Sequence, residues 1–354
     1  MAGVGWKEKL LRQYRYWQCR PARVKKRLLA QSEEKREIAS IKGRCLRVAA
    51  LQVEVELFSD PLDYVDAMHR RVREAAALGA HLVAFPEYNN LPLLGMLPGI
   101  EAMGEEVSRT EPGSAESADQ PGITVADVVR YIGPAMAPFL DTLYSTLAAE
   151  YGIYLMSGSF LLPDGDQVVN RAFLYSPQGQ LIGIQDKVHL MPMEAAWGVS
   201  AGTRFNLFDT EIGSIAAPVC MDATYFETFR ILELQGAEIV IIPIANPEPY
   251  NQWLALRGIW PRVQECPVYG IKSALVGRLL GFEFTGRAGI FAPAELTSDG
   301  SGILDIVVSP EEEGIALAEI DLAELQKLRS DHPWRDNNQA LYRRYFPRIY
   351  HSLT

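Results

Sequence analysis

Residues 214–230 read SIAAPVCMDATYFETFR, and the predicted fold and chemistry both follow from this stretch. The apolar run Ile215–Val219 predicts a buried strand that ends at Cys220, and a polar turn then leads into a predicted helix that reaches about Gln235. Backbone N–H groups are unpaired where a helix begins, so a thiol at this junction lies where an anion can be held. A single cysteine after an apolar strand is nevertheless more often a small buried hydrophobe. The interpretation of Cys220 therefore depends on the rest of the chain.

Two other stretches place charged residues at the ends of predicted core strands. In residues 81–89, HLVAFPEYN, an apolar strand runs into Pro86 and Glu87. In residues 185–202, QDKVHLMPMEAAWGVSAG, Lys187 closes another strand. Proteins built on sheets carry much of their chemistry on the loops that follow strand ends. Either charge alone is more often a solvated or structural one, but together the three stretches predict a site with a carboxylate, an ammonium and a thiol.

The order and flanks of these residues resemble the nitrilase, or carbon–nitrogen hydrolase, superfamily over residues 46–346. Four short motifs carry the resemblance: Phe85-Pro86-Glu87, Lys187-Val188-His189-Leu190, Glu194 with Trp197 and Gly198 behind it, and Cys220-Met221-Asp222 followed by Glu227 and Arg230. The resemblance implies a single-domain α/β fold, a four-layer α-β-β-α sandwich of the nitrilase type. The alternation of predicted strands and helices supports on its own only an α/β fold with mixed sheets.

The resemblance also implies how the site would hydrolyse an amide. Cys220 suits the nucleophile, because a thiolate is strongly nucleophilic near neutral pH. Glu87 would take the thiol proton and later pass it to the departing amine. Lys187 and the backbone N–H of Met221 would stabilise the tetrahedral oxyanion. Glu194 resembles the family's second carboxylate, which holds the lysine. This chemistry requires no metal and no organic cofactor.

Four further residues are predicted to contact the substrate: Tyr88, Trp197, Met221 and Tyr225. Aromatic residues near a site belong to the core as often as to a pocket. His189 is predicted to be structural, hydrogen-bonded behind the site.

The residues that follow Cys220 bear on the type of substrate. Met221-Asp222 stands where true nitrilases carry Trp and Glu, which favours amides or N-carbamoyl compounds over nitriles. Alternatives are a nitrilase, an acyl-transferring member of the superfamily, or a non-catalytic scaffold on the same fold.

Composition indicates a soluble globular protein. The chain has 354 residues, 48% of them hydrophobic, which suffices for a large core. No run approaches the length of a membrane helix, and the N-terminus lacks the apolar core of a signal peptide. The four cysteines show no C-x-x-C spacing, which disfavours zinc or a disulfide framework and suggests a cytoplasmic location.

Charge is distributed unevenly along the chain. The net charge is −10, but residues 1–47 hold 14 Lys and Arg against 4 Glu. This basic arm is predicted to be helical with a break near Pro21, and to dock on the acidic remainder of the same or a neighbouring chain through Trp6, Tyr14 and Trp17. Attachment to an anionic membrane surface is possible but not favoured, and nucleic-acid binding is least favoured.

The remaining pattern divides the chain into a basic helical extension (1–45), a hydrolase domain (46–346) and a C-terminal tail (347–354). Helices are predicted over 61–79, over 127–151 with a bend or split at Pro134 and Pro138, and over 251–265. Residues 89–121 are rich in Gly, Pro and acidic residues, and predict a lid over the pocket, with a plain surface loop as the alternative. An acidic lid would suit a cationic substrate. In the family, a segment such as 333–350 packs across a subunit interface, which implies a homo-oligomer.

Overall fold

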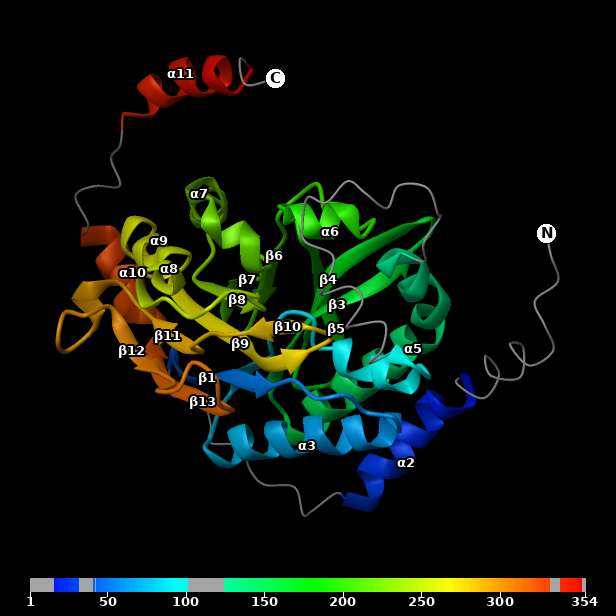
Figure 1. Cartoon of the computed structure of the whole chain (residues 1–354). Helices are drawn as coiled ribbons and strands as arrows, with labels where there is room; N and C mark the ends of the chain where they lie inside the picture. Colours follow the sequence, from blue (N-terminus) through cyan, green and yellow to red (C-terminus); the bar gives the residue numbers. More distant parts are fainter. Residues whose placement is uncertain (1–15, 32–40, 42, 101–123, 332–337, 352–354) are drawn as a thin grey trace.

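A computed structural model describes residues 16–31, 41, 43–100, 124–331 and 338–351 of the chain. Its strands form one continuous hydrogen-bonded system (Figure 1). The main path follows the order β5 (Leu181–Asp186), β4 (Gln167–Tyr175), β3 (Tyr154–Asp164), β2 (Leu82–Ala84), β1 (Cys45–Glu54), β9 (Tyr269–Leu279), β8 (Ile239–Ile244), β7 (Gly213–Ala216) and β6 (Leu207–Thr210). The shorter β10 (Phe282–Phe284), β11 (Gly289–Phe291), β12 (Ile303–Ile306) and β13 (Gly314–Asp321) pair beside β9 and β1.

The central strands run parallel and are buried on both faces. β1 pairs in parallel with β2 and β9, and β8 pairs in parallel with β7 and β9. Side chains alternate along β1, so Val48 and Ala50 join one core while Ala49 and Leu51 join another. Strands with two apolar faces need a helical layer on each outer side.

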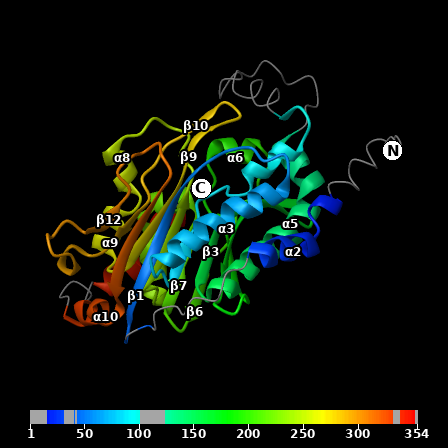
Figure 2. The same ribbon diagram turned by 90° about the horizontal axis from the view of Figure 1, so that it is seen from below.

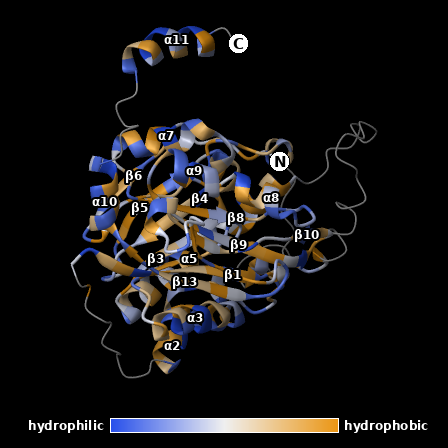
Figure 3. Ribbon diagram, turned by 90° about the vertical axis from the view of Figure 1, so that its left-hand side faces the viewer, coloured by the Kyte–Doolittle hydropathy of each residue, from blue (hydrophilic) through white to orange (hydrophobic). Residues whose placement is uncertain are grey.

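Those helical layers are present on both sides of the strands (Figures 1 and 2). α3 (Pro61–Ala77) and α5 (Val125–Tyr151) bury residues in the first core, together with Ala49 and Leu51. α7 (Phe226–Gln235), α9 (Trp260–Glu265) and α10 (Leu322–Asp331) bury residues in the second core, with Val48 and Ala50. The predicted α/β sandwich is therefore confirmed. Figure 3 shows the apolar residues concentrated on the inner strands.

Local sequence signals explain the boundaries of the two long helices. α3 begins at Pro61, and the side chain of Asp60 accepts a hydrogen bond from the N–H of Leu62. α5 begins with a capping box between Thr124 and Asp127. It runs without interruption through Pro134 and Pro138, so these prolines do not split it as the sequence allowed. Burial of one face against β3 and the two neighbouring helices α2 and α3 offsets the lost backbone hydrogen bonds.

The region around Cys220 differs from the sequence prediction. β7 ends at Ala216 rather than at Val219, because Pro218 has no N–H to donate to a neighbouring strand. The predicted helix after Cys220 is a 3₁₀ turn, η2 (Cys220–Thr224), followed by α7 after an extended residue, Tyr225. Residues 251–265 likewise form two short helices, α8 (Gln252–Arg257) and α9, rather than one.

The described part of the basic arm forms α2 (Pro21–Gln31), which begins at the predicted break and lies against α3 and α5 (Figure 2). Val24 and Leu28 are fully buried. Arg27 forms an ion pair with Asp66 of α3. Of the predicted anchors, Trp6 and Tyr14 lie outside the described residues. Trp17 is 46% exposed and packs on the Arg23 guanidinium, so it is not a buried anchor within its own chain.

The predicted lid and tail are described only in part. The segment after Asn90 forms a 3₁₀ helix, η1 (Leu91–Met96), with Leu93 buried in the core, whereas residues 101–123 lie outside the described residues. α11 (Gln339–His351) has no buried residue (Figure 1). No helix within the described ranges combines the length and apolar character needed to cross a membrane.

Candidate active site

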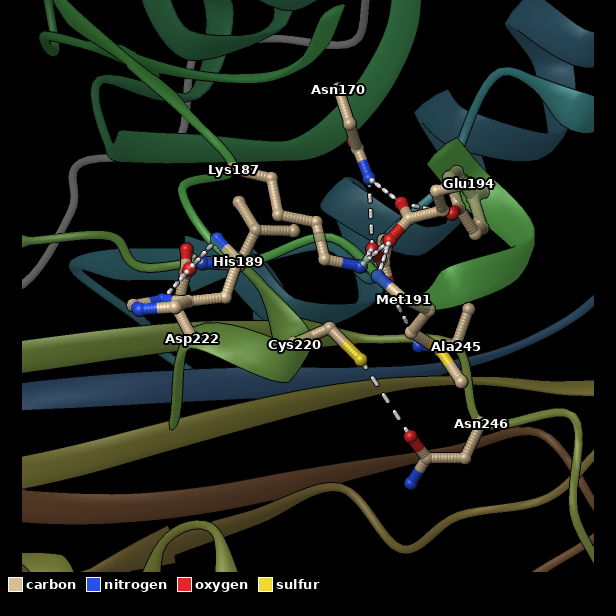
Figure 4. Close-up of polar contacts among 12 residues, drawn as sticks. Asn170, Lys187, His189, Met191, Glu194, Cys220, Asp222, Ala245 and Asn246 are labelled. Carbon is tan, nitrogen blue, oxygen red and sulfur yellow. Dashed lines mark hydrogen bonds and ion pairs between the residues drawn. The ribbon is translucent and has the colours of Figure 1, made fainter. Parts of the chain in front are cut away.

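The three predicted catalytic residues follow three different strands. Glu87 lies three residues after the end of β2, Lys187 directly follows β5, and Cys220 begins η2 after β7. The end of β8 reaches the same place, because the N–H of Ala245 donates to Oε2 of Glu87 at 3.1 Å. The fold therefore brings together residues that are separated by up to 158 positions, and Figure 4 shows the side chains that meet there.

Lys187 lies between two buried carboxylates. Its Nζ is 2.8 Å from Oε1 of Glu87 and 2.7 Å from Oε2 of Glu194. The three side chains are at most 1% exposed. Buried charges are stable only when they are paired and hydrogen-bonded, and each carboxylate has further donors here. The ammonium is thus held in one position by two anions.

Glu194 comes from the first turn of a short helix, α6 (Pro192–Ala196). Its Oε2 accepts from the N–H of Met191 at 2.8 Å, and its Oε1 accepts from the hydroxyl of Tyr88. Burial raises the pKa of Tyr88 well above its usual value, so the phenol keeps the proton that it donates. Tyr88 therefore orients a carboxylate, and its predicted contact with the substrate stays a prediction.

Asn170 is a site residue that the sequence did not single out. It lies in β4 with no exposed surface, and its Nδ2 donates to Oε1 of Glu87 at 2.8 Å and to Oε1 of Glu194 at 3.2 Å. Its backbone carbonyl accepts from the N–H of Lys187 at 2.9 Å. A polar residue within the apolar run of β4, Val168-Val169-Asn170, was the available signal.

Cys220 adopts a backbone conformation that side chains rarely take, with φ at 45°. Such strain is concentrated at functional positions and requires support from the surrounding structure. The side chain is partly buried, contacts the Glu87 carboxylate, and donates to Oδ1 of Asn246 across 3.7 Å. The thiol thus lies between the buried carboxylate and the open side of the site.

Asp222 supplies that support. Its carboxylate has no exposed surface and accepts from the N–H of Val219 at 2.9 Å and from the N–H of His189 at 2.7 Å. The His189 ring lies 2.9 Å from the same carboxylate. Asp222 therefore joins the loop after Lys187 to the turn that carries Cys220. The prediction that His189 is a hydrogen-bonded structural residue is confirmed.

Burial and neighbouring charges shift the acid–base properties of the site in a consistent direction. Burial raises the pKa of Glu87, although Lys187 opposes the shift. Burial, with the negative charge of Glu87, also raises the pKa of the Cys220 thiol. Burial disfavours the charged form of Lys187, but its anionic neighbours outweigh this and raise its pKa. The resting thiol is therefore protonated beside a carboxyl group able to take the proton, and the ammonium stays charged.

Two cavities adjoin the site, and Met191 lines both. The first, of about 120 Å³, is here named the polar cavity and is lined by Cys220, Met221, Asn246, Arg257, Lys272 and Thr285, among others. The second, of about 140 Å³, is named the apolar cavity and is lined by Tyr88, Leu94, Trp197, Phe282 and Phe284, among others. The thiol thus opens onto the polar cavity.

The predicted substrate contacts are distributed unevenly over these cavities. Met221 lines the polar cavity, whereas Tyr88 and Trp197 line the apolar one. Tyr225 lines neither: it is 39% exposed and stacks on His189 with ring centroids 4.2 Å apart. Tyr225 is the extended residue at the break between η2 and α7.

Residues 47–330 match the model of the carbon–nitrogen hydrolase family, so the chain belongs to that family. A probable hydrolase YhcX from Bacillus subtilis is 25% identical over 292 residues, which cover 81% of this chain and 52% of the relative. A nitrilase from Pyrococcus abyssi is 31% identical over 182 residues, which cover 51% and 64% of the two chains. This chain thus spans about half to two thirds of the length of these relatives.

Solved structures share the fold at lower identity. A carbon–nitrogen hydrolase from Helicobacter pylori matches with a TM-score of 0.65 and 20% identity, over 85% of this chain and 97% of that one. An amidase from Nesterenkonia matches with a TM-score of 0.59 and 19% identity, over 85% and 96% of the two chains. The matched structure is a glutamate-to-glutamine mutant of that amidase, with the acetamide moiety of fluoroacetamide added covalently at the active-site cysteine.

Proposed function

We propose that the protein is a thiol-dependent hydrolase that cleaves the non-peptide C–N bond of a small amide or N-carbamoyl compound. The observation that carries the proposal is the contact of the Cys220 thiol with Glu87, whose carboxylate is paired with the buried Lys187 ammonium. A nucleophile, a proton acceptor and a fixed cation are what acyl transfer needs at one place. Membership of the carbon–nitrogen hydrolase family supports the same chemistry.

In the first half of the proposed reaction, Glu87 takes the proton of the Cys220 thiol as Sγ attacks the carbonyl carbon. The negative charge that develops on the carbonyl oxygen is stabilised by Lys187 and by the backbone N–H of Met221. Glu87 then returns the proton to the nitrogen, and the C–N bond breaks. Ammonia or an amine leaves, and the acyl group remains on Cys220 as a thioester.

In the second half, water attacks the thioester while Glu87 takes one of its protons. The tetrahedral intermediate collapses, the C–S bond breaks, and Glu87 reprotonates the sulfur. Glu194 acts throughout by holding Lys187 at 2.7 Å, so the ammonium needs no rearrangement as charge develops. Asn170 and Tyr88 are positioning residues that hold the two carboxylates.

Amides or N-carbamoyl compounds are proposed as better substrates than nitriles. The sequence Met221-Asp222 after the nucleophile supports this choice. The curated relatives include both a nitrilase and the omega-amidase NIT2-B of Xenopus laevis, which is 24% identical over 51% of this chain. A nitrilase is therefore the second candidate, favoured by the 31% identity to the Pyrococcus relative.

Ammonia release from a panel of small amides, N-carbamoyl compounds and matching nitriles tests the proposed function. The expected result is turnover of amides or carbamoyl compounds with the higher kcat/KM, and none by Cys220→Ala. A higher kcat/KM for the nitriles would select the second candidate. Equal ammonia release by the wild type and by Cys220→Ala would show that the thiol has no part in the reaction.

We also propose that the protein works in a reducing compartment such as the cytoplasm and as a homo-oligomer. The four cysteines are unpaired, which suits reducing conditions. The exposed apolar residues of α11, Leu341, Tyr345 and Phe346 among them, support a contact between subunits. Light scattering of the full chain, compared with a chain that ends at residue 331, measures that contribution.

A further inference from the structure

The polar cavity contains a buried lysine that the proposed reaction does not use. Lys272 lies in β9, is 3% exposed, and lines the same cavity as Cys220. Its Nζ donates to the carbonyl oxygen of Ala255 at 3.2 Å and lies 5.5 Å from the centre of the Phe291 ring. Unlike Lys187, it has no carboxylate at ion-pair distance within the described parts of the chain.

A buried ammonium without a counter-ion is unfavourable, because burial removes the water that stabilises its charge. The group has three N–H donors, and one carbonyl oxygen with one aromatic face satisfies it only in part. Burial, with the nearby positive charge of Arg287, lowers the pKa of Lys272 to about 8. The side chain therefore still carries its proton at neutral pH, in a cavity large enough to admit a ligand.

The sheet register places Lys272 on the wall of the cavity that ends at the thiol. Lys272 pairs with Ile242 of β8, and Ile242, Ile244 and Asn246 alternate along the cavity wall. Asn246 is the residue that contacts Cys220. Ile242, beside Lys272, and Asn246, beside the thiol, are four residues apart, which is roughly 13 Å along an extended strand. An extended substrate attacked at the thiol could therefore reach along the cavity towards Lys272.

The other charged residues of the polar cavity are Arg257 and Glu248, and both are exposed at its rim. Apart from Glu87, Lys187 and Glu194 at the site itself, Lys272 is therefore the buried charge that a ligand meets inside the polar cavity. The acidic residues of segment 101–120 suggested a cationic substrate, and this segment lies outside the described residues. The position of Lys272 argues against a cationic substrate. A cation at this depth would meet a like charge.

We propose that Lys272 binds a carboxylate of the substrate, so that the enzyme selects anionic amides such as the monoamides of dicarboxylic acids. This assignment rests on the proposed function, since it concerns the far end of the molecule that Cys220 attacks. The carboxylate would supply the counter-ion that Lys272 lacks, with charge-assisted hydrogen bonds from the remaining N–H donors.

The test compares kcat/KM for a dicarboxylic acid monoamide with that for its methyl ester, which is nearly the same size but neutral. The wild type is expected to prefer the anionic amide roughly ten- to hundredfold, the range for a hydrogen-bonded charge pair. Lys272→Met removes the charge at similar length and is expected to abolish the preference. Lys327→Met, an exposed lysine on α10, is the matched control and should keep it.

A second measurement uses the wild type alone, in case Lys272→Met does not fold. A non-hydrolysable dicarboxylate should protect Cys220 from alkylation by iodoacetamide better than its neutral dimethyl ester. Equal protection, or an unchanged preference in a folded Lys272→Met variant, overturns the assignment of Lys272 while amide turnover still supports the proposed function. Failure of the wild type to turn over any amide, with Cys220 unmodified, would overturn both.

Discussion

The side-chain amide of Asn170 lies 2.8 Å from Oε1 of Glu87, so a residue inside a strand holds the carboxylate that faces the thiol. The same nitrogen also reaches Glu194 at 3.2 Å. One amide donor therefore bridges the two carboxylates that hold Lys187. A hydrogen bond to a carboxylate favours its ionised form, so Asn170 opposes the effect of burial on Glu87.

The first prediction follows from that contact. Asn170→Leu removes the donor at similar volume, and we expect the pKa of Glu87 to rise further. The acid limb of kcat/KM should move to higher pH, because activity requires the ionised carboxylate. Asn206→Leu is the control, since the side chain of Asn206 donates to the carbonyl of Ile184 rather than to a carboxylate of the described residues. An unshifted limb in a folded Asn170→Leu enzyme would contradict the positioning role.

The second prediction concerns Glu87 itself. Glu87→Gln keeps the size and the acceptor for Ala245 but cannot take a proton, so kcat should fall by about 10² to 10⁴. In the wild type, burial raises the pKa of Glu87, so activity should be lost as the pH falls through a value higher than the pKa of an ordinary glutamate. Glu283 is an exposed carboxylate on β10, so Glu283→Gln should leave kcat and the pH dependence of activity unchanged. Steady-state kinetics against pH provide the measurement.

The third prediction concerns the stability of the turn that carries the thiol. Asp222→Asn replaces a buried acceptor with a group that presents N–H donors to the N–H groups of Val219 and His189. We expect a loss of about 3 kcal/mol in the free energy of unfolding, typical for breaking a buried charged network. Asp209→Asn, an exposed residue, should cost within about 0.5 kcal/mol. Similar denaturant midpoints for the two variants would contradict this role of Asp222.

The fourth prediction concerns the basic arm. Leu28 is 1% exposed and anchors α2 against α3 and α5, whereas the adjacent Leu29 is 76% exposed. Leu28→Ala should therefore speed limited proteolysis of the arm, since buried Leu→Ala changes cost about 2–5 kcal/mol, and Leu29→Ala should not. Moderate salt should have little effect, because the exposed Arg27–Asp66 pair contributes little. Equal cleavage rates in the two variants would show that apolar packing does not hold α2.

Glu87, Lys187 and Cys220 could be predicted as candidates because each lies at or just after the end of a predicted strand, and the local pattern of a strand is readable from its own residues. Asn170 left only one local signal, a polar residue within an apolar run, and Lys272 was not singled out at all. Their importance depends on which strands pair and in what register, and this information is distributed over the whole sheet. The position of Tyr225 outside both cavities was not predicted for a related reason, because nearness in sequence to Cys220 did not reveal the break between η2 and α7.

The elements of the fold could likewise be predicted where the signal lies in their own residues. The long helices α3 and α5 carry a clear apolar periodicity and strong caps, so the limits predicted for them lie close to the observed ones. The end of β7 was misplaced by three residues, since the apolar run continues through Pro218 although hydrogen bonding does not. The arm was expected to dock, and within its own chain the buried residues of α2 are Val24 and Leu28, whereas Trp17 is exposed.

The central claim is that Cys220 carries the acyl group, and intact mass spectrometry during turnover of a slow amide substrate tests it most directly. The wild type should gain the mass of the acyl moiety, with the adduct mapped to Cys220, and the adduct should disappear as substrate is consumed. A folded Cys220→Ala variant should show no adduct and no turnover, while Cys266→Ala, which removes a thiol away from the site, should behave as the wild type. Turnover by Cys220→Ala at the wild-type rate, or an adduct on another residue, would contradict the account.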